Sequence, residues 1–362
     1  MDVLASETLL FSSFMLVIGL LIYYIVQQVY FYMLAIILLC VVYKLVSKRF
    51  AKKIDDVNGK GILITGCDTG IGYATALRLC KAGFYVFAGC LNPDCDGAKT
   101  LKEKGGERLQ VVSIDVTDDE SIKQALETTR QGLPGLGLWA VINNAGIELA
   151  AEIEFASIEM MKHVADVNFY GMVRVTKAFL PLIRKTRGRV VNVTSAKGRL
   201  PWPADTAYVS SKYAGEAFSD ILRREMYRFG VKVAIIEPGK FSNITGILQG
   251  ERLCLAVDAL NQSWELASEE IKEAYGRRCI DDLITAFRDD YKLGPESLDP
   301  VTDAMLDAVA NVNPKCRYLV HGTHHSFDKY CILALLNQYL PEPLFDHFSR
   351  WILPLPPVNQ QV

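Results

Sequence analysis

Tyr208, Lys212 and Ser195 are the residues whose types and spacing are best suited to chemistry. Tyr208 and Lys212 stand four residues apart in "YVSSK", so a helix would place the phenol and the ammonium group on one face. A lysine beside a tyrosine favours the phenolate and lowers the pKa of the phenol. Such a phenol can take a proton from an alcohol or give one to a carbonyl. Ser195, thirteen residues before Tyr208, could hydrogen-bond the same substrate oxygen.

A glycine-rich turn lies between an apolar and an amphipathic run in "LITGCDTGIGYATALRL", residues 63–79. Gly66 can make a tight turn, Gly70 lets the backbone approach a pyrophosphate, and Gly72 allows close packing of helix and strand. The free N–H groups at the start of the helix would then face an anion. Taken alone, this stretch could also be a tight strand-to-helix turn without a ligand, and YxxxK could be a solvated helix face.

Seven apolar, strand-like runs alternate with helix-like segments from residue 61 onward. Continuous apolar strands between helices indicate a parallel sheet that is covered on both faces. The pattern therefore predicts an α/β fold with a doubly wound, seven-stranded parallel sheet. The runs are 61–65, 84–89, 109–114, 138–142, 189–194, 231–236 and 317–320. Ser195 would end the fifth strand, and Tyr208 would lie on the helix that follows.

The N-terminal segment contains no charged residue from Leu9 to Tyr43, a run of 35 residues. As one helix this run would be about 52 Å long, whereas the hydrocarbon core of a bilayer measures about 30 Å. One tilted membrane helix and a two-pass hairpin that turns near Gln27 and Gln28 both fit. A cleaved signal peptide fits poorly, because the preceding residues are acidic and no small-residue cleavage site follows.

A basic cluster directly follows the apolar run. It consists of Lys44, Lys48, Arg49, Lys52 and Lys53. The positive-inside rule places such a cluster in the cytosol, although a solvated linker would have the same composition. We expect residues 1–53 to be a membrane anchor and basic linker that carries a cytosol-facing domain.

The rest of the chain divides by composition. Residues 54–321 carry the strand–helix pattern, which a more charged segment interrupts at 240–300, with short helices such as 264–275. An insertion after a late strand lies over the ligand crevice of such a sheet, so this segment is predicted to be a substrate-recognition lobe. Residues 322–362 form a C-terminal apolar tail with several prolines, which would pack on the fold or touch a membrane.

Composition argues against several classes of protein. The net charge of -2 gives no basic footprint for nucleic acid. The nine cysteines include no CxxC pair and no matching histidine spacing, so we expect neither a metal site nor a disulfide framework.

The motifs together resemble the short-chain dehydrogenase/reductase family, in its order and spacing, from about residue 59 to 320. The matching elements are TGCDTGIG at 65–72, Asp115-Val, "NNAG" at 143–146, Asn168, Ser195, Tyr208 with Lys212, and Pro238-Gly239. The resemblance implies a Rossmann-like fold, a nicotinamide cofactor and an ordered catalytic tetrad.

The resemblance also implies a role for each of these residues. Tyr208 would be the acid/base, Lys212 would lower its pKa and hold the nicotinamide ribose, and Ser195 would polarise the substrate oxygen. Asn168 would hold a water on the proton path. Asp115 would contact adenine, Asn143 and Gly146 would support the adenosine side, and Pro238 and Gly239 would line the nicotinamide pocket. The full set expected at the cofactor is Gly66, Asp68, Gly70, Ile71, Gly72, Asp115, Asn143, Gly146, Tyr208, Lys212, Pro238 and Gly239.

Longer stretches, among them "VTKAFLPLIRKTRGRVVNV" and "YLPEPLFDHF", resemble one branch of the family. That branch holds estradiol 17-beta-dehydrogenase type 2, membrane-bound retinol dehydrogenases and mitochondrial D-beta-hydroxybutyrate dehydrogenase. A mitochondrial enzyme would begin with an Arg-rich, cleavable transit segment, whereas this chain has an uncharged anchor. We therefore expect oxidation of a secondary alcohol of a steroid-like lipid, at a membrane that is the endoplasmic reticulum or, alternatively, mitochondrial. Retinol and D-3-hydroxybutyrate are the alternative substrates, and a non-catalytic, cofactor-binding scaffold is the alternative of another class.

The cofactor expectation rests on the charges near the glycine turn. Asp68 lies within the turn, and neither Lys nor Arg occurs between Gly66 and Tyr73, so a 2′-phosphate would meet a carboxylate and no cation. We expect NAD, with NADP as the alternative. Asn243 stands where many members have a threonine that binds the carboxamide. The resemblance also implies a homodimer that pairs through two helices, 157–185 and 205–229.

Overall fold

The computed structural model describes residues 2–49, 53–54, 56–133, 135, 137–247, 250–290, 294–322, 328–352, 355 and 358. Lys52 of the basic cluster lies outside these residues, as do 323–327 and much of 353–362 in the expected tail. The chain divides into two compact units, Met1–Lys53 and Ile54–Val362.

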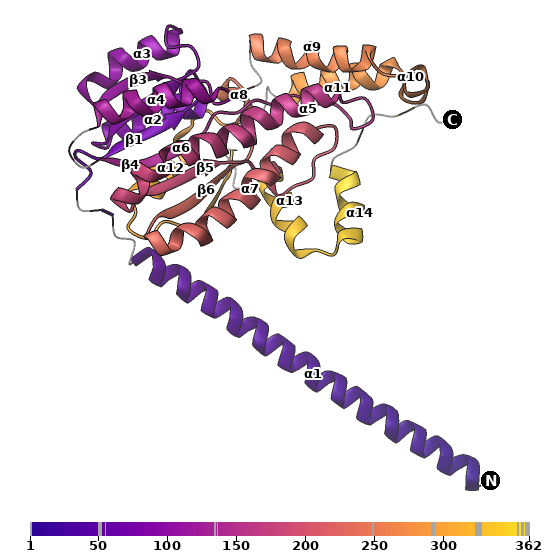
Figure 1. Cartoon of the computed structure of the whole chain (residues 1–362). Helices are drawn as coiled ribbons and strands as arrows, with labels where there is room; N and C mark the ends of the chain where they lie inside the picture. The colour runs from indigo at the N-terminus through magenta and orange to yellow at the C-terminus, as the bar shows by residue number, and fades with distance from the viewer. Residues whose placement is uncertain are drawn as a thin grey trace. The chain divides into compact units, whose positions relative to one another are not determined.

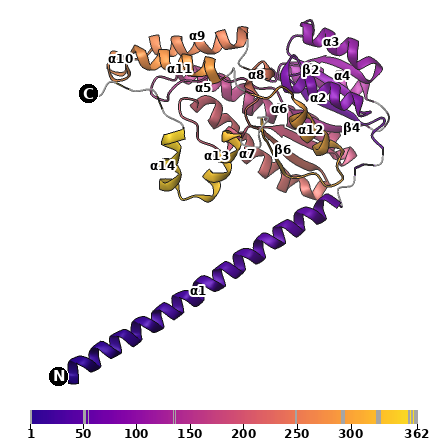
Figure 2. The same ribbon diagram turned by 180° about the vertical axis from the view of Figure 1, so that it is seen from behind.

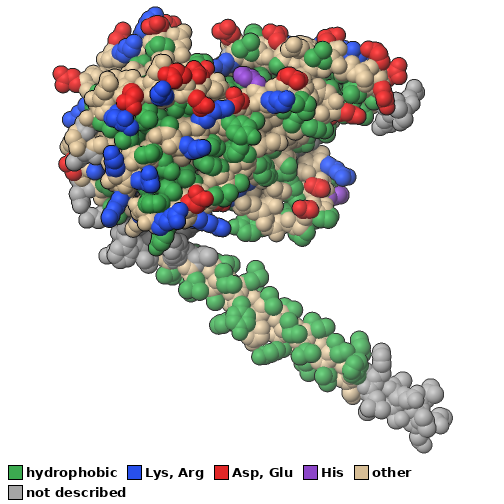
Figure 3. Space-filling model, in the orientation of Figure 1, with side chains coloured by type: hydrophobic (Ala, Val, Ile, Leu, Met, Phe, Trp, Pro, Cys, Tyr) green, Lys and Arg blue, Asp and Glu red, His purple; other side chains and the backbone are tan. Residues whose placement is uncertain are grey.

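The N-terminal unit contains one long helix, α1 (Asp2–Arg49). Within it, Ser13–Leu39 has 27 residues and a mean hydropathy of 1.9, and none of its most apolar window is buried. Hydrophobic side chains cover its described length (Figure 3). By length and composition this stretch could cross a bilayer. The single-helix alternative is the one found, because the helix continues through Gln27 and Gln28 without a turn.

The second unit is built on a parallel sheet with the order β3-β2-β1-β4-β5-β6-β7, seven strands in the described part of the chain (Figure 1). The strands are β1 (Gly61–Thr65), β2 (Tyr85–Cys90), β3 (Leu109–Ser113), β4 (Leu138–Asn143), β5 (Arg189–Val193), β6 (Lys232–Pro238) and β7 (Arg317–Val320). Each overlaps one of the apolar runs in the sequence, so the predicted doubly wound, Rossmann-like fold is confirmed.

Helices cover both faces of this sheet (Figures 1 and 2). One face carries α2 (Gly70–Lys81), α3 (Asp96–Gly105) and α12 (Asp299–Ala310), and the other carries α4 (Asp119–Gly132), α6 (Met172–Thr186) and α7 (Thr206–Met226). Successive strand residues point to opposite faces. Ile62 and Ile64 accordingly belong to one core cluster and Leu63 to the other, which explains why β1 is apolar throughout.

The strand order reverses between β1 and β4, and this position fixes where a ligand can bind. In open α/β sheets the crevice lies outside the carboxyl ends of the strands at such a switch point. The glycine turn follows β1, and Asn144 follows the adjacent β4. Asn144 Nδ2 donates to the carbonyls of Thr65 (2.9 Å) and Gly66 (3.0 Å), which ties the two strand ends together.

The expected helix at 157–185 is interrupted. It consists of α5 (Ile158–Ala165), a π-helical turn (Asp166–Gly171) and α6. A hydrophobic period of 3.6 residues cannot reveal one wider turn. The turn contains Asn168, which it places in a buried position.

The expected helix at 264–275 is wrong, since that range spans two helices. The segment between β6 and β7 contains α8 (Ser242–Thr245), α9 (Glu251–Glu265), α10 (Glu269–Tyr275) and α11 (Arg277–Asp290). Ser268 has extended backbone angles, and its hydroxyl accepts from Ile271 N–H at 3.3 Å, so it starts a new helix.

The C-terminal segment contains α13 (Lys329–Tyr339) and α14 (Glu342–Ile352). Tyr330 and Leu333 of α13 and Phe345 of α14 pack with Ala196 and Leu200, which follow β5. The described part of the tail therefore packs on the fold close to the strand that ends before Ser195.

Candidate functional site

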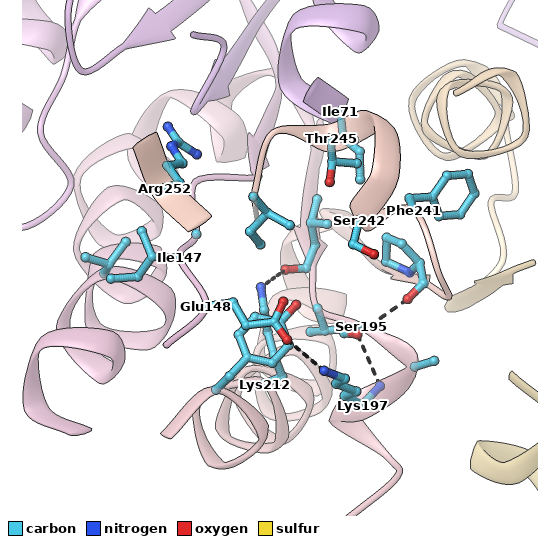
Figure 4. A pocket seen from close by; sticks show the side chains of 18 of the residues that line it. Ile71, Ile147, Glu148, Ser195, Lys197, Lys212, Phe241, Ser242, Thr245 and Arg252 are labelled. Atoms are coloured by element: carbon cyan, nitrogen blue, oxygen red, sulfur yellow. Dashed lines mark hydrogen bonds and ion pairs between the residues drawn. The ribbon is translucent and has the colours of Figure 1, made fainter. Parts of the chain in front are cut away.

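A cavity of about 580 Å³ opens at the carboxyl ends of the strands (Figure 4). Its wall includes Gly66 after β1, Ala145 after β4, Ser195 after β5, and Pro238 at the end of β6. The cavity therefore lies at the switch point, where the sheet topology predicts a ligand site.

Ser195, Tyr208 and Lys212 meet in this cavity, although they come from two different elements. Tyr208 and Lys212 lie one turn apart on α7, and the Lys212 Nζ is 5.4 Å from the centroid of the Tyr208 ring. Lys212 also donates to the Val193 carbonyl at 3.2 Å, which fixes its ammonium group. The Ser195 hydroxyl donates to the Pro238 carbonyl at 3.4 Å.

The electrostatics of Tyr208 correct one expectation. Burial raises the pKa of this phenol above its ordinary value, and the nearby Glu148 carboxylate raises it further, whereas Lys197 and Ser195 act in the opposite direction. The expected net lowering of the pKa by Lys212 is therefore not found. Burial lowers the pKa of Lys212 itself to about 8, although Glu148 and Glu216 oppose this.

Asn168 lies behind the cavity wall. Its Oδ1 accepts from Ile147 N–H at 2.8 Å, and its Nδ2 donates to the Ile147 carbonyl at 2.9 Å and to Ser211 Oγ at 3.0 Å. The amide of Asn168 thus holds the backbone that follows Gly146. Both polar atoms of the side chain are therefore engaged in bonds within the protein.

The glycine turn has the shape of an anion cradle. Gly66 and Gly70 have φ of +70° and +63°, which few other residues adopt. A Cβ on Gly70 would strike the carbonyl of Thr245, and one on Gly72 would strike the carbonyl of Gly66. Thr69 makes no side-chain cap at the start of α2, so the first N–H groups of the helix are available to a phosphate.

Two acidic residues lie at the β2–β3 end of the cavity. The Asp68 carboxylate accepts from the N–H groups of Leu91 (3.2 Å) and Asn92 (3.0 Å), which follow β2. Asp115 accepts from Thr117 N–H at 2.9 Å and from its hydroxyl at 2.7 Å. Both acids line the cavity, so they face the end at which an adenosine would lie.

The remaining cofactor candidates divide into those that line the cavity and those that support it. Ile71, Gly146, Pro238 and Gly239 line it. Asn143 lies within the sheet instead, where its Nδ2 donates to Thr176 Oγ1 (2.9 Å) and Asn192 Oδ1 (2.8 Å). Its neighbour Asn144 is the one that reaches the glycine turn, because successive strand residues point to opposite faces.

Asn243 does not reach the described cavity wall either. Its Nδ2 donates to the Pro295 carbonyl at 2.8 Å. Ser242 and Thr245 of the same short helix line the cavity instead, as do Phe241 and Trp202.

Asp328 is a functional candidate that the sequence did not indicate. Its Oδ2 accepts from the N–H groups of Lys240 (2.9 Å) and Gly322 (2.8 Å), and its Oδ1 accepts from Tyr330 N–H at 2.9 Å. The residue is fully buried. It therefore joins the C-terminal segment to the loop after Pro238 and Gly239. The sequence analysis placed Asp328 only within the C-terminal apolar tail, and the structure shows that it caps the start of α13.

We expect Asp328→Asn to destabilise the fold by about 1–3 kcal/mol, because an amide cannot accept from all these donors without placing its own N–H₂ group against one. Urea unfolding of the unit Ile54–Val362 within the detergent-solubilised chain would measure the loss of unfolding free energy. Asp303→Asn is the matched control, since Asp303 is exposed and pairs only with Arg78 in the described structure. An equal loss in both variants would contradict the role of Asp328.

A charged cluster beside Tyr208 was also missed. Glu148, Lys197 and Asp205 come from three separate segments, and Lys197 contacts both acids. No pattern of sequence spacing links them, since only the fold brings the loop after β4 against the start of α7.

The residues of the cavity fit a nicotinamide dinucleotide. The glycine turn has room for a pyrophosphate because its glycines carry no side chains, and the start of α2 offers N–H groups to it. Asp68 and Asp115 face the end at which the adenosine would lie. The Ser195, Tyr208 and Lys212 side chains lie at the opposite end of the cavity, where the reactive ring would be.

Comparisons with known proteins point to the same family that the sequence motifs resemble. The model of the short chain dehydrogenase family matches residues 60–252. D-beta-hydroxybutyrate dehydrogenase, mitochondrial, of Bos taurus is 40% identical over 292 residues, which cover 80% of this chain and 83% of that protein. Retinol dehydrogenase 7 of Rattus norvegicus is 40% identical over 321 residues, covering 88% and 96%. The 17-beta-hydroxysteroid dehydrogenase type 6 of Homo sapiens is 36% identical over 310 residues, covering 85% and 93%.

Proposed function

The chain belongs to the short-chain dehydrogenase/reductase family, and from this premise we propose that it is a membrane-anchored enzyme that oxidises a secondary alcohol of a steroid-like lipid with NAD. The observation that carries the proposal is the meeting of Ser195, Tyr208 and Lys212 in a cavity with a largely apolar outer wall. That wall includes Trp202, Leu283, Phe287, Ile352 and Leu355.

Each residue of the catalytic set has a defined task in this reaction. The Ser195 hydroxyl would hydrogen-bond the substrate oxygen, and the Tyr208 phenolate would take the hydroxyl proton. Lys212 would hold the nicotinamide ribose and balance the charge of the phenolate. Asn168 would keep the wall at Ile147 in place, and by resemblance to the family it would hold a water on the proton path. The bound nicotinamide supplies the hydride acceptor.

The apolar side chains of this wall favour a lipophilic substrate. Two of the three relatives described above are named for retinol and for hydroxysteroids. Retinol and D-3-hydroxybutyrate remain the alternative substrates, because the relative named for hydroxybutyrate is as similar in sequence as the retinol dehydrogenase.

Two parts of the chain support an attachment to a membrane. The apolar stretch Ser13–Leu39 is long enough to span a bilayer, and a basic cluster follows it. Phe348 and Trp351 of α14 are exposed, while Ile352 at its end lines the cavity. We place the domain on the cytosolic side of the endoplasmic reticulum, with a mitochondrial membrane as the alternative.

The resemblance to the family also favours a homodimer. In the described structure a shallow groove lies between α5 and α7, and the exposed side chains of Ile158 and Tyr170 border it. A second copy would cover this apolar surface, and light scattering of the detergent-solubilised chain would measure the mass of the assembly.

NAD is preferred over NADP in this proposal because Asp68 would face a 2′-phosphate. We expect Asp68→Ala to raise kcat/KM for NADP relative to NAD by about 10-fold, since one repulsive charge is removed. Initial rates with each cofactor would measure the ratio. Asp96→Ala is the control, because Asp96 on α3 is fully exposed. A wild-type preference for NADP would contradict the assignment.

The direct test of the proposal is NADH formation by the detergent-solubilised full chain with estradiol, testosterone, retinol and D-3-hydroxybutyrate. Turnover of a steroid in preference to the others is the expected result. Turnover of hydroxybutyrate alone would contradict the substrate class. Binding of NAD without turnover of any alcohol would favour the scaffold alternative.

A further inference from the structure

Glu148, Lys197 and Asp205 form a buried ionic cluster next to the proposed catalytic tyrosine. The Lys197 Nζ lies 2.7 Å from Glu148 Oε1 and 2.7 Å from Asp205 Oδ2. The side chains of Lys197, Glu148 and Asp205 are only 14%, 8% and 1% exposed. Removing three charges from water is costly, so a cluster like this needs an explanation beyond stability.

The position of Lys197 relative to Tyr208 gives that explanation. The Lys197 Nζ lies 5.5 Å from the centroid of the Tyr208 ring, and the Lys212 Nζ lies 5.4 Å from the same point. Two ammonium groups from different elements therefore flank one phenol. Figure 4 shows Glu148 and Lys197 directed toward each other beside Ser195 and Lys212.

The cluster is held in this place from both ends. Lys197 is the second residue after Ser195, and its backbone N–H donates to Ser195 Oγ at 3.1 Å. Asp205 is three residues before Tyr208, at the start of α7. Any movement of Lys197 would therefore disturb both the serine and the tyrosine of the active site.

The other groups around the cluster are also accounted for. Lys197 lies 5.6 Å from the Trp202 ring and 6.0 Å from the Tyr330 ring of α13. Lys240 and Lys329 lie over Tyr330, at 6.0 Å and 5.3 Å, on the side of the C-terminal segment. In the described structure the cations over the Tyr208 ring itself are Lys197 and Lys212.

We propose that Lys197 is a second positioning residue of the dehydrogenase, which stabilises the Tyr208 phenolate together with Lys212, and that Glu148 opposes it. This inference rests on the proposed function, because it assigns a task to Tyr208 as the base. Asp205 holds Lys197 in place and balances part of its charge.

The charge states of the cluster agree with this geometry. Burial disfavours the charged form of Lys197, but Asp205 and Glu148 outweigh it and hold the pKa of the ammonium well above its usual value. Burial raises the pKa of Asp205 to about 8, although the Lys197 ammonium opposes this shift.

Two variants of opposite sign test the proposal. We expect Lys197→Gln to move the midpoint of the pH profile of kcat/KM for alcohol oxidation upward by about one unit, because a cation that favours the phenolate is lost. Glu148→Gln should move the midpoint downward by a similar amount. Lys197→Arg should restore the wild-type midpoint. Lys123→Gln on α4 is the matched control, since Lys123 is exposed.

A purely structural cluster would lower activity at every pH and leave all midpoints in place, and that result would overturn the inference. Ultraviolet difference titration of tyrosinate, with saturating cofactor and with Tyr208→Phe subtracted, measures the same shifts without a substrate. If no alcohol is oxidised but the titration shows the shifts, the proposed function fails and only the electrostatic part of the inference stands, namely that Lys197 favours the Tyr208 phenolate and Glu148 opposes it. If alcohols are oxidised and neither method shows shifts, only the inference fails.

Discussion

Tyr208→Phe is expected to lower kcat for alcohol oxidation by about 10²- to 10⁴-fold, which is the usual contribution of one acid–base group. The phenyl ring fills the same buried space on α7, so the fold and the cavity should persist. The hydroxyl that would take the proton is lost. Steady-state rates of NADH formation, with NAD affinity measured by quenching of protein fluorescence, would separate chemistry from binding.

Tyr213→Phe is the matched control for this change. Tyr213 lies on the same helix but is 38% exposed and outside the described wall of the cavity. Its loss should leave kcat within about a factor of two, as for other surface changes. If Tyr208→Phe retained wild-type turnover, Tyr208 could not be the base.

Gly70→Ala is expected to weaken NAD binding by about 10-fold or more. The backbone there has φ of +63°, and a left-handed conformation costs an alanine about 1–2 kcal/mol. The added methyl group would also strike the carbonyl of Thr245, so the start of α2 and the short helix α8 must move apart. Titration calorimetry with NAD would measure the affinity.

Gly106→Ala separates the two causes. Gly106 also has a positive φ of +57°, but nothing lies within 4 Å of the position of its Cβ. That variant should lose stability and keep its affinity for NAD. Equal affinity in the wild type and in Gly70→Ala would show that the glycine turn does not hold the cofactor.

The sheet was predictable because each strand is apolar on both faces. β1 contributes Ile62 and Ile64 to one core cluster and Leu63 to the other, so its sequence has no polar interruption. The glycine turn was predictable from the spacing of its three glycines. The structure shows why glycine is needed there, because a Cβ at each position would clash with nearby backbone. The helix boundaries around Asn168 and Ser268 were not predictable, because a π-turn and a helix restart leave the hydrophobic period almost unchanged.

The electrostatics of the site could not be predicted from spacing. Tyr208 and Lys212 are close in sequence, so their proximity was evident, but the raised pKa of Tyr208 comes first from burial and then from Glu148, sixty residues earlier in the chain. Asp328 likewise bonds Lys240 across 88 residues of sequence. Contacts of this kind depend on the complete fold.

The position of Asn143 shows the same limit on a smaller scale. Asn143 ends β4 and Asn144 follows it, and the sequence analysis assigned the cofactor role to Asn143. The pleat directs Asn143 to Thr176 and Asn192 inside the sheet and leaves Asn144 to bond the glycine turn.

The central claim is that the chain transfers hydride from the carbinol carbon of a lipid alcohol to NAD, with Tyr208 as the base. The measurement that tests it most directly uses estradiol deuterated at carbon 17, with the detergent-solubilised full chain and NAD. Mass spectrometry of the NADH then reports where the deuterium has gone. We predict one deuterium per NADH formed by the wild type and almost no NADH from Tyr208→Phe. NADH without deuterium, or as much deuterated NADH from the Tyr208→Phe variant as from the wild type, would contradict the account.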